Sequence, residues 1–515
     1  MKPTAKYESI LISNGDKDSS TKAQSVFDGD GSGVTGAFRG LRRLVQTHVV
    51  SERIRILIWI LMFFANMCFH LARKSFSAVK GVLKPNCSAN YSTSGWEPFS
   101  GPHGNTYLGI TDSSFLFTYA VFMYLSGYIA DRVNTRYFLV IGMVGSGVGS
   151  ILLGVAYFAD IHVLYYFILV QLGTGAAQSA SWPAVMAVMG HWFGKQRRGL
   201  IMGIWYMHTS IGNILGTVIP SIWATCDGPW GWSFVVPGFI IIGVSVPVFL
   251  LLVPGPEDVG LCPPTHQTTQ TPLINEEVVS CKKAKPLGPL KTLMIPGVIE
   301  YSLALFFIKL VSYTFLFWLP FYITTGNHGY IGKTKISAQV SDWLATTFDM
   351  GGIIGTIVIG GLSDLLKVRS VLVVVSLVLA APLLFLYHHF SNVHVALSVV
   401  LLIISGATVN GPYGVVATAI SSDLATDPLL VGNDNAKATV AAIIDGTGSL
   451  GAAIGPLIAG AVSEYSWNDT FYILMASCLI SALLLSRLLI VEIVSCYRMR
   501  HKNQRKVNIL FEAQK

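Results

Sequence analysis

Three basic side chains lie in the middle of an otherwise apolar stretch near the start of the chain. Residues 56–85 are apolar enough to lie in a bilayer, yet they contain His70, Arg73 and Lys74. Burying a charged group in hydrocarbon costs about 2.5 to 3.5 kcal/mol on insertion scales, so such groups face a polar cavity and are functional there. Because these groups are basic, the sequence predicts a cavity that binds phosphate.

A further cation, Lys309, lies in a second apolar stretch, residues 296–323. Two short motifs each occur twice in the sequence, one pair 233 and the other 239 residues apart. These displacements put the counterpart of Arg73 between residues 306 and 312, where Lys309 is the only cation. Arginine can fork onto two phosphate oxygens, whereas lysine supplies a point charge. Two cations at related positions near the membrane midplane would form a site for a phosphate dianion.

Other ionisable groups lie at a similar depth. Arg73 is the expected primary ligand, and the adjacent Lys74 is rotated from it by about 100° around the helix. Lys74 is therefore either a second ligand or the partner of a buried carboxylate, which Asp349 or Asp445 would supply; a structural ion pair is the favoured role for both acids. His208 either contacts the phosphate or forms a hydrogen bond to a neighbouring helix.

The composition predicts a membrane protein. Of 515 residues, 52% are hydrophobic and 12% are charged, too few charges to cover a soluble globule. Without the alternation typical of a barrel, the spans are expected to be helices. The first fifty residues show no cleaved signal peptide. Stretches of about 20 apolar residues number twelve: 56–80, 111–130, 137–157, 162–188, 200–224, 233–253, 296–323, 339–362, 369–388, 395–420, 437–461 and 470–493.

The charges predict the orientation of these spans. The net charge is +8, and the basic residues cluster beside helix ends on one face of a twelve-span arrangement. Only scattered lysines, such as Lys80 and Lys84, fall on the opposite face. Basic loops mark the cytoplasmic side, so both termini are predicted to be cytoplasmic. This pattern explains the positive charge without a nucleic-acid partner.

The opposite face carries three glycosylation sequons, at Asn86, Asn90 and Asn468. Glycans are added to such tripeptides on the lumenal or extracellular side, which agrees with the charge pattern. Cys87 and Cys226 fall on the same face, where a disulfide can persist. The two cysteines either form that disulfide or remain two thiols.

Two internal echoes predict that the twelve spans form two six-helix halves. A G-x3-D-x4-R pattern follows the second and the eighth span, and a G-x3-G pattern recurs in the fifth and eleventh. The expected organisation is a cytoplasmic tail over 1–55, a six-helix half over 56–254, a cytoplasmic linker over 255–294, a second half over 295–495 and a cytoplasmic tail over 496–515.

This arrangement resembles the major facilitator superfamily over nearly the whole chain. The resemblance implies an all-α membrane protein with twelve transmembrane helices. It also implies that the repeated motif latches helix ends together in one access state, whereas the alternative is that its charges are ordinary basic flanks of membrane spans. The motif residues are Gly127, Asp131, Arg132, Arg136, Asp364 and Arg369.

Within that superfamily, the segment Arg73-Lys74-Ser75-Phe76 is similar to the R-K-x-F of the organophosphate:phosphate antiporters. The stretch 178–183 (QSASWP) and the run 309–314 (KLVSYT) extend the resemblance to the animal sugar-phosphate exchangers. The resemblance implies exchange of inorganic phosphate for glucose-6-phosphate, across the endoplasmic reticulum membrane or alternatively the plasma membrane. Tyr119, Tyr124 and Tyr313 would then contact the sugar ring, unless they pack between helices.

Two other functions of the same fold stay open from the sequence. One is proton-coupled transport of a sugar or organic anion, with Asp349, Asp445 or His208 as the proton site. The other is a sensor that does not transport. The sequence contains no zinc ligand cluster, glycine-rich phosphate loop or close catalytic His/Asp pair, so we expect neither an enzyme nor a metal or cofactor.

Overall fold

The computed structural model describes residues 48–84, 95–130, 132–193, 198–225, 228–259, 293–325, 330–332, 334–424 and 437–498. Within these ranges the chain is almost entirely helical. The two short strands β1 (Tyr330–Ile331) and β2 (Thr334–Lys335) pair antiparallel, with Tyr330 opposite Lys335. The predicted all-α fold class is therefore confirmed.

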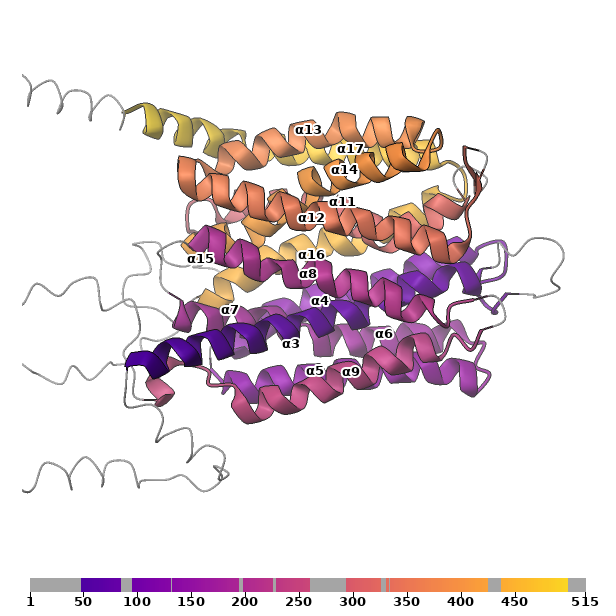
Figure 1. Cartoon of the computed structure of the whole chain (residues 1–515), viewed down its shortest axis with the longest axis horizontal. Helices are drawn as coiled ribbons and strands as arrows, with labels where there is room; N and C mark the ends of the chain where they lie inside the picture. Colours follow the sequence, from indigo (N-terminus) through magenta and orange to yellow (C-terminus); the bar gives the residue numbers. More distant parts are fainter. Residues whose placement is uncertain are drawn as a thin grey trace, which may run out of the picture. The chain divides into compact units, whose positions relative to one another are not determined.

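The helices follow the predicted spans in order along the chain (Figure 1). We call α3–α9 the N-terminal half and α11–α17 the C-terminal half. The N-terminal half contains α3 (His48–Leu83), α4 (Gly104–Ala130), α5 (Thr135–Phe158), α6 (Leu164–Gln178), α7 (Ser181–Trp192), α8 (Arg198–Ser221) and α9 (Trp232–Leu251), followed by the short helix η1 (Pro256–Val259). The C-terminal half contains α11 (Val298–Thr325), α12 (Ala338–Leu366), α13 (Arg369–Phe390), α14 (Val395–Val415), the π-helical turn η3 (Val416–Ile420), α15 (Ser421–Leu424), α16 (Lys437–Val462) and α17 (Trp467–Leu484).

Ten helices within the described ranges are long and apolar enough to cross a membrane. The remaining two of the twelve predicted spans correspond to α6 with α7 and to α8. The fourth predicted span is thus divided into two consecutive helices, because α6 ends at Gln178 and α7 begins at Ser181. The chain is a multi-pass membrane protein.

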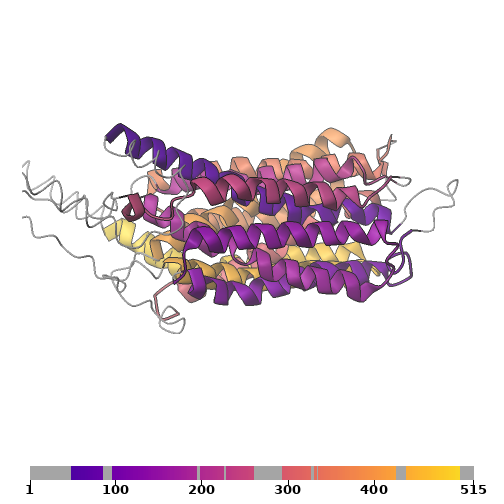
Figure 2. The same cartoon turned by 90° about the horizontal axis from the view of Figure 1, so that it is seen from below.

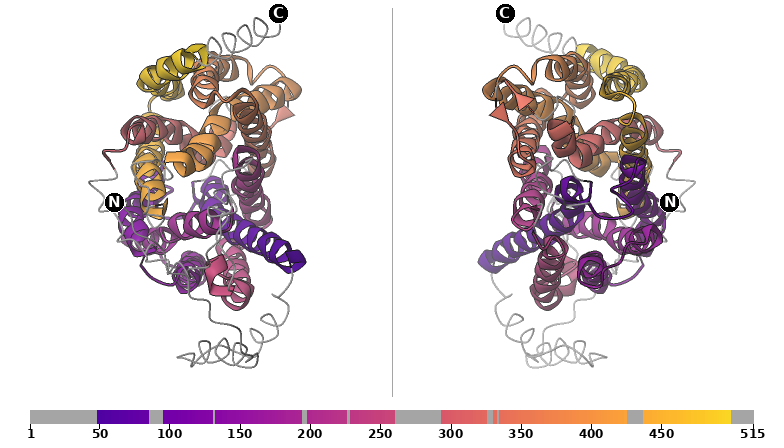
Figure 3. Two further views of the ribbon diagram at one scale, coloured as in Figure 1. Left: turned by 90° about the vertical axis from the view of Figure 1, so that its left-hand side faces the viewer. Right: turned by 90° about the vertical axis from the view of Figure 1, so that its right-hand side faces the viewer.

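Consecutive long helices run in opposite directions, so their ends gather at two levels (Figures 1 and 2). We call the level where α9 ends and α11 begins the linker end, and the level where α3 ends and α4 begins the loop end. Seen along the helix axes, the helices of each half lie together (Figure 3). The halves meet through α4 against α16 and α8 against α12.

The two halves pack their helices in the same way. A β-carbon on Gly212 of α8 would collide with the carbonyl of Met67 in α3, and one on Gly451 of α16 would collide with the carbonyl of Phe306 in α11. Small residues allow this close approach of helices. Both members of each pair are displaced by 239 residues, so this packing relates α3 to α11 at that displacement. It pairs His70 with Lys309.

Candidate functional site

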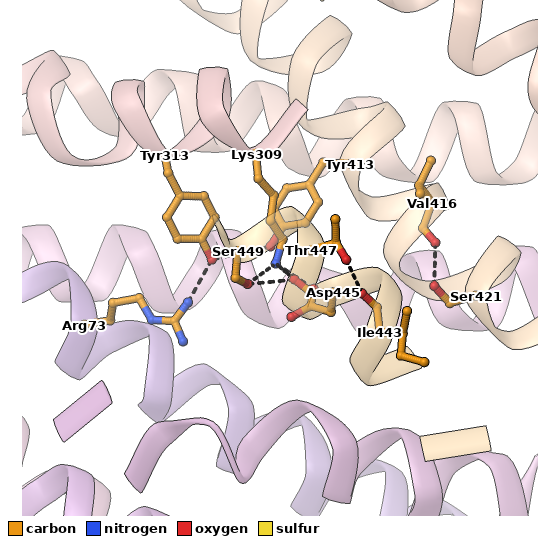
Figure 4. Close-up of polar contacts among 10 residues, drawn as sticks. All are labelled: Arg73, Lys309, Tyr313, Tyr413, Val416, Ser421, Ile443, Asp445, Thr447 and Ser449. Carbon is orange, nitrogen blue, oxygen red and sulfur yellow. Dashed lines mark hydrogen bonds and ion pairs between the residues drawn. The ribbon is translucent and has the colours of Figure 1, made fainter. Parts of the chain in front are cut away.

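Arg73 lies in the second half of α3 and is buried. Its Nε and Nη2 both donate to Oε1 of Gln178, at 3.1 and 3.0 Å. Its Nη1 donates to the hydroxyl of Tyr313, at 2.8 Å, in the other half of the chain (Figure 4). The guanidinium carbon lies 4.5 Å from the ring centroid of Tyr119, which is a cation–π contact. All of these partners are neutral.

Gln178 is itself held in place by two contacts. Its Nε2 donates to Ser146 Oγ at 2.7 Å and to the carbonyl of Phe69 at 3.3 Å. Because both amide protons are used in this way, the amide oxygen points at Arg73. The last residue of α6 therefore orients the guanidinium.

Lys309 lies in α11 with 1% of its side chain exposed. Its Nζ forms an ion pair with Asp445 Oδ1 at 2.6 Å, donates to Ser449 Oγ at 3.0 Å and lies 3.3 Å from the carbonyl of Asp445 (Figure 4). The structure thus pairs Asp445 with Lys309 and not with Lys74. These contacts satisfy the ammonium group inside the C-terminal half.

Two tyrosines link the cations of the two halves. The hydroxyl of Tyr313 accepts from Arg73 and lies 3.5 Å from the hydroxyl of Tyr413. Lys309 Nζ lies 5.8 Å from the ring centroid of Tyr313 and 5.4 Å from that of Tyr413. Arg73 and Lys309 therefore approach the same pair of rings from opposite halves. Among the described residues Arg73 has no ion pair, whereas Lys309 has one.

The adjacent Lys74 contacts α11 one turn before a proline of that helix. Pro320 lies inside this helix and lacks the N–H that would bond the carbonyl of Leu316. That carbonyl instead accepts from Lys74 Nζ and from Ser77 Oγ, the latter at 3.2 Å. A proline in one half therefore provides an acceptor for a lysine of the other.

Lys80, one further turn along α3, is buried and forms an ion pair with Asp112 of α4. Its Nζ also donates to the carbonyl of Phe317 at 3.1 Å and lies 4.4 Å from the ring centroid of Trp318. The sequence analysis counted Lys80 among the scattered lysines of the opposite face, whereas the structure places it buried inside α3, which continues to Leu83. Lys80 instead joins the two halves near the loop end.

Asp349 and His208 are held by local partners. Asp349 Oδ1 accepts from Asn213 Nδ2 at 3.0 Å, and its carboxylate lies near enough to Lys74 to act on it electrostatically. Nδ1 of His208 donates to the carbonyl of Trp205 at 2.7 Å, and its Nε2 lies 3.2 Å from Thr209 Oγ1. The hydrogen bonds of His208 are thus made within its own helix, α8, and not with a neighbouring helix.

The second copy of the repeated motif forms an ion pair at the linker end. Asp364 Oδ1 lies 3.2 Å from Nη2 of Arg369. The backbone N–H groups of Arg369 and Val371 donate to the carboxylate of Glu492, at 2.7 and 3.1 Å. A carboxylate in this position stabilises the start of α13, because the first N–H groups of a helix have no partner within it.

The first copy is only partly described. Asp131 lies outside the described residues, whereas Gly127 is buried in α4. Arg132 donates to the carbonyl of Tyr128 at 2.8 Å and covers its ring. The backbone N–H of Arg136 is capped by the side chain of Asn134, at 3.0 Å. Whether this copy forms a latch stays a prediction.

Of the predicted glycosylation and disulfide residues, only Asn468 lies within the described residues. Asn86, Asn90, Cys87 and Cys226 fall outside the described residues. Asn468 is exposed at the start of α17, at the loop end, where its Oδ1 lies 2.7 Å from Nε2 of His388.

Tyr124, the third tyrosine that the sequence analysis named for the sugar ring, lies 2.9 Å from Thr447 Oγ1, across the two halves.

Several polar residues around the cations were not singled out by the sequence prediction. Gln178 contacts Arg73, Tyr413 lies near Lys309, and Asp112 pairs with Lys80. Asn213 of α8 and Asn410 of α14 line the same cavity, one from each half. All are polar residues within apolar spans, which is the one signal that the sequence offered for them.

A family model described as Major Facilitator Superfamily matches residues 62–333 and 329–507. The chain is 43% identical over 475 residues to the Bos taurus protein named glucose-6-phosphate exchanger SLC37A2, covering 86% of this chain and 95% of that protein. It is also 43% identical over 451 residues to the Arabidopsis thaliana protein named putative glycerol-3-phosphate transporter 2, covering 86% and 88%.

A solved structure shares the fold. A bacterial homolog of the human lysosomal transporter Spinster, crystallised in an inward-facing and unoccupied conformation, superposes with a TM-score of 0.54. The match covers 84% of this chain and 95% of that one, at 12% identity. At this identity the similarity supports the fold alone.

The buried pair of Lys80 and Asp112 yields a stability prediction. We expect Asp112→Asn to destabilise the protein by about 3–5 kcal/mol, because the substitution leaves the Lys80 ammonium buried without a counter-charge. The measurement is the unfolding temperature of purified protein in detergent. The double variant Lys80→Met with Asp112→Leu should recover most of the loss, because it removes both charges. Glu300→Gln, whose partner Arg487 is 64% exposed, is the control and should change stability by about 1 kcal/mol or less. Equal effects of Asp112→Asn and Glu300→Gln would contradict the prediction.

Proposed function

The chain belongs to the major facilitator superfamily and, within it, to the sugar-phosphate exchangers, and on this premise we propose that it exchanges inorganic phosphate for a sugar phosphate by alternating access. The observation that carries the proposal is the convergence of Arg73 and Lys309, from opposite halves, on Tyr313 and Tyr413. The names of the relatives support an organic phosphate as the second substrate. We propose glucose-6-phosphate, transported without chemical change.

Arg73 is the proposed anchor of the phosphate. Its guanidinium is buried among neutral groups and has no carboxylate partner in the described part of the chain. A phosphate oxygen pair would replace Tyr313 and Gln178 as acceptors and form charge-assisted, bidentate hydrogen bonds, which are stronger than those to neutral oxygens. Because Gln178 orients the guanidinium, the fork is already aimed at this site.

Lys309 is the proposed second ligand, with its charge shared between the phosphate and Asp445. Its ammonium has three protons, which go to the carboxylate of Asp445, to Ser449 Oγ and, at the longer distance of 3.3 Å, to the carbonyl of Asp445. A phosphate that reached the tyrosine pair would compete with Asp445 for this ammonium. Asp445 then serves to keep Lys309 satisfied whenever the phosphate is elsewhere, and Lys74 contributes positive charge at longer range.

Obligatory exchange follows from the charge on Arg73. A buried cation without a counter-charge is costly, and a bound phosphate dianion offsets that cost. Closing the halves around the anion is therefore easier than closing them empty. A ligand shifts a conformational balance only by its differential affinity for the two states, and here neutralisation of Arg73 supplies the difference.

Several of the contacts that would have to break during alternating access lie toward the loop end. Thr106 Oγ1 donates to Glu464 at 2.8 Å, and Ser113 Oγ donates to the carbonyl of Ala453 at 2.8 Å. Lys74, Ser77 and Lys80 of α3 add further contacts, because they donate to backbone carbonyls of α11. The described state is thus held together at this end by polar contacts between the halves.

We further propose that both termini are cytoplasmic and that the protein resides in the endoplasmic reticulum membrane. The basic clusters beside the helix ends support the orientation. The exposed position of Asn468 at the loop end is compatible with a glycan on the lumenal side. The predicted limits of the two halves and of the linker are proposed on the same basis.

Uptake of labelled glucose-6-phosphate into phosphate-loaded proteoliposomes tests the proposed function. We expect Arg73→Ala to lower the uptake rate by at least about a hundred-fold, because charge-assisted hydrogen bonds contribute about 1.5–3 kcal/mol each and the variant loses two. Lys309→Ala should have a similar effect, because it also leaves Asp445 unpaired.

The control for both substitutions is Arg487→Ala, which removes an exposed cation and should leave uptake within about two-fold. Full uptake by the Arg73 and Lys309 variants would contradict the proposed site. Uptake that depends on a pH gradient but not on internal phosphate would favour the proton-coupled transporter. Absence of any uptake by the unaltered, folded protein would favour the sensor.

The efflux of labelled phosphate tests obligatory exchange. From vesicles placed in buffer without phosphate or sugar phosphate, we expect slow efflux, because the halves close with difficulty around an uncompensated Arg73. Addition of unlabelled phosphate outside should accelerate the efflux. An equal rate with and without the external substrate would refute strict exchange, even if uptake itself is confirmed.

Glycosylation tests the proposed orientation. In protein from eukaryotic cells, glycosidase treatment should increase the electrophoretic mobility, and substituting Gln at Asn86, Asn90 and Asn468 together should abolish the change. The matched control is Asn392→Gln, which alters an exposed asparagine outside a sequon. An unglycosylated protein whose termini are accessible from the lumen would contradict the orientation.

A further inference from the structure

A second polar cavity adjoins the cations, between the two halves. Its walls come from α3 and α8 of the N-terminal half and from α11, α12 and α14 of the C-terminal half. The polar side chains that define it are His70, Asn213, Ser312, Asp349, Asn410 and Tyr413. Tyr313 and Tyr413 line this cavity and also lie beside Lys309, so the cavity is continuous with the site of the two cations (Figure 4).

Three buried polar atoms on this cavity make no hydrogen bond within the described residues. They are Nδ1 of His70, Oδ1 of Asn213 and the hydroxyl of Tyr206. The three residues are 9%, 5% and 5% exposed. His70 lies beside Asn213, and Tyr206 lies beside Tyr413 and Thr209, so these groups are one another's nearest polar partners. Buried polar atoms are nearly always paired, so three loosely partnered atoms on one cavity mark a place where water or a hydroxyl of a ligand can bond.

The arrangement of donors and acceptors suits hydroxyl groups. Asn213 donates its Nδ2 to Asp349 and its Oδ1 makes no hydrogen bond, whereas Asn410 Oδ1 accepts from Ser312 at 2.6 Å. A hydroxyl both donates and accepts, so it can satisfy an amide oxygen, a tyrosine and a carboxylate. A phosphate would be repelled by Asp349. The charged end of a substrate therefore belongs at Arg73, and a polyhydroxylated end belongs here.

The position of this cavity also suits a transported group. The other cavity beside Arg73 is lined by residues of the N-terminal half such as Asp112, Ser150 and Gln171, with Phe317 as the exception. A group bound there would move with one half. The cavity around Asn213 and Asn410 is shared by both halves, so it opens when they separate on either side of the membrane.

We infer that this cavity is the subsite for the sugar hydroxyls, and that Asn213, Asn410 and His70 select a hexose phosphate over glycerol 3-phosphate. The inference rests on the proposed exchange of phosphate for an organic phosphate and assigns the second substrate. Glycerol 3-phosphate has too few hydroxyls to reach these groups, which would stay unpaired. Sites built to bond a hydroxyl discriminate strongly against ligands that lack it.

Two exchange reactions in the same proteoliposomes test the inference. The variants Asn213→Ala and Asn410→Ala should each weaken the inhibition of phosphate exchange by glucose-6-phosphate by about ten-fold, the equivalent of a lost hydrogen bond. Phosphate-for-phosphate exchange itself, and its inhibition by glycerol 3-phosphate, should stay within about two-fold. The matched control is Asn66→Ala, because Asn66 is a buried asparagine that donates to the carbonyl of Met62 in its own helix and lines neither cavity.

The outcomes separate this inference from the proposed function. Unchanged inhibition by glucose-6-phosphate in both variants would overturn the sugar subsite while phosphate exchange persists. Equal loss of phosphate exchange and of sugar-phosphate inhibition would overturn it too, because the asparagines would then serve the phosphate. Absence of phosphate exchange in the unaltered protein would instead refute the proposed function.

A measurement on the unaltered protein avoids any effect of the substitutions on folding. Analogues of glucose-6-phosphate that each lack one hydroxyl are compared as inhibitors of phosphate exchange. We expect at least one deoxy analogue to bind about ten-fold more weakly, by the loss of one hydrogen bond. If every deoxy analogue and glycerol 3-phosphate inhibit as well as glucose-6-phosphate, the cavity does not read hydroxyls and the inference is wrong.

Discussion

The uncompensated charge of Arg73 is the constraint on which the rest of the structure depends. A guanidinium in the middle of a membrane helix is tolerated because it is enclosed by protein and because an amide oxygen, a phenol and an aromatic face solvate it. None of these neighbours carries a negative charge. Lys309 differs, because Asp445 neutralises it within its own half. Among the described residues Arg73 therefore lacks an anionic partner, and in the proposed exchange this would tie recognition of a phosphate to closure of the halves.

The helix that carries the proposed phosphate anchor, α3, also forms contacts between the halves. Arg73, Ser77 and Lys80 follow the spacing that places side chains on one face of a helix, and all three contact α11. The carbonyl of Leu316, left without its helical donor by Pro320, accepts from Lys74 in the same seam. Movement of α3 relative to α11 must break these contacts together. An anion on Arg73, at one end of the row, therefore acts directly on the seam between the halves.

The sequence was sufficient for the elements and for the cations, but not for their partners. A charged residue within an apolar span is easily recognised in a sequence, so Arg73 and Lys309 were predicted as site residues from their positions in the spans. Which carboxylate meets which cation depends on the rotation and register of helices far apart in the chain. For this reason the sequence left both Asp349 and Asp445 open as partners of Lys74, although Asp445 lies beside Lys309. Lys80 was counted with the lysines of the loops because its buried partner, Asp112, lies on another helix.

Pseudo-symmetry explains why the two cations are not equivalent. The glycine contacts relate α3 to α11 at a displacement of 239 residues, which pairs Lys309 with His70 and Arg73 with Ser312. Lys309 therefore lies about one helical turn from the true counterpart of Arg73. A symmetric pair of cations would suit phosphate alone. The counterparts here are a histidine and a serine, both on the cavity with the unpaired polar atoms. Departure from symmetry thus creates a charged end and a neutral polar end, which matches a substrate with a phosphate at one end and hydroxyls at the other.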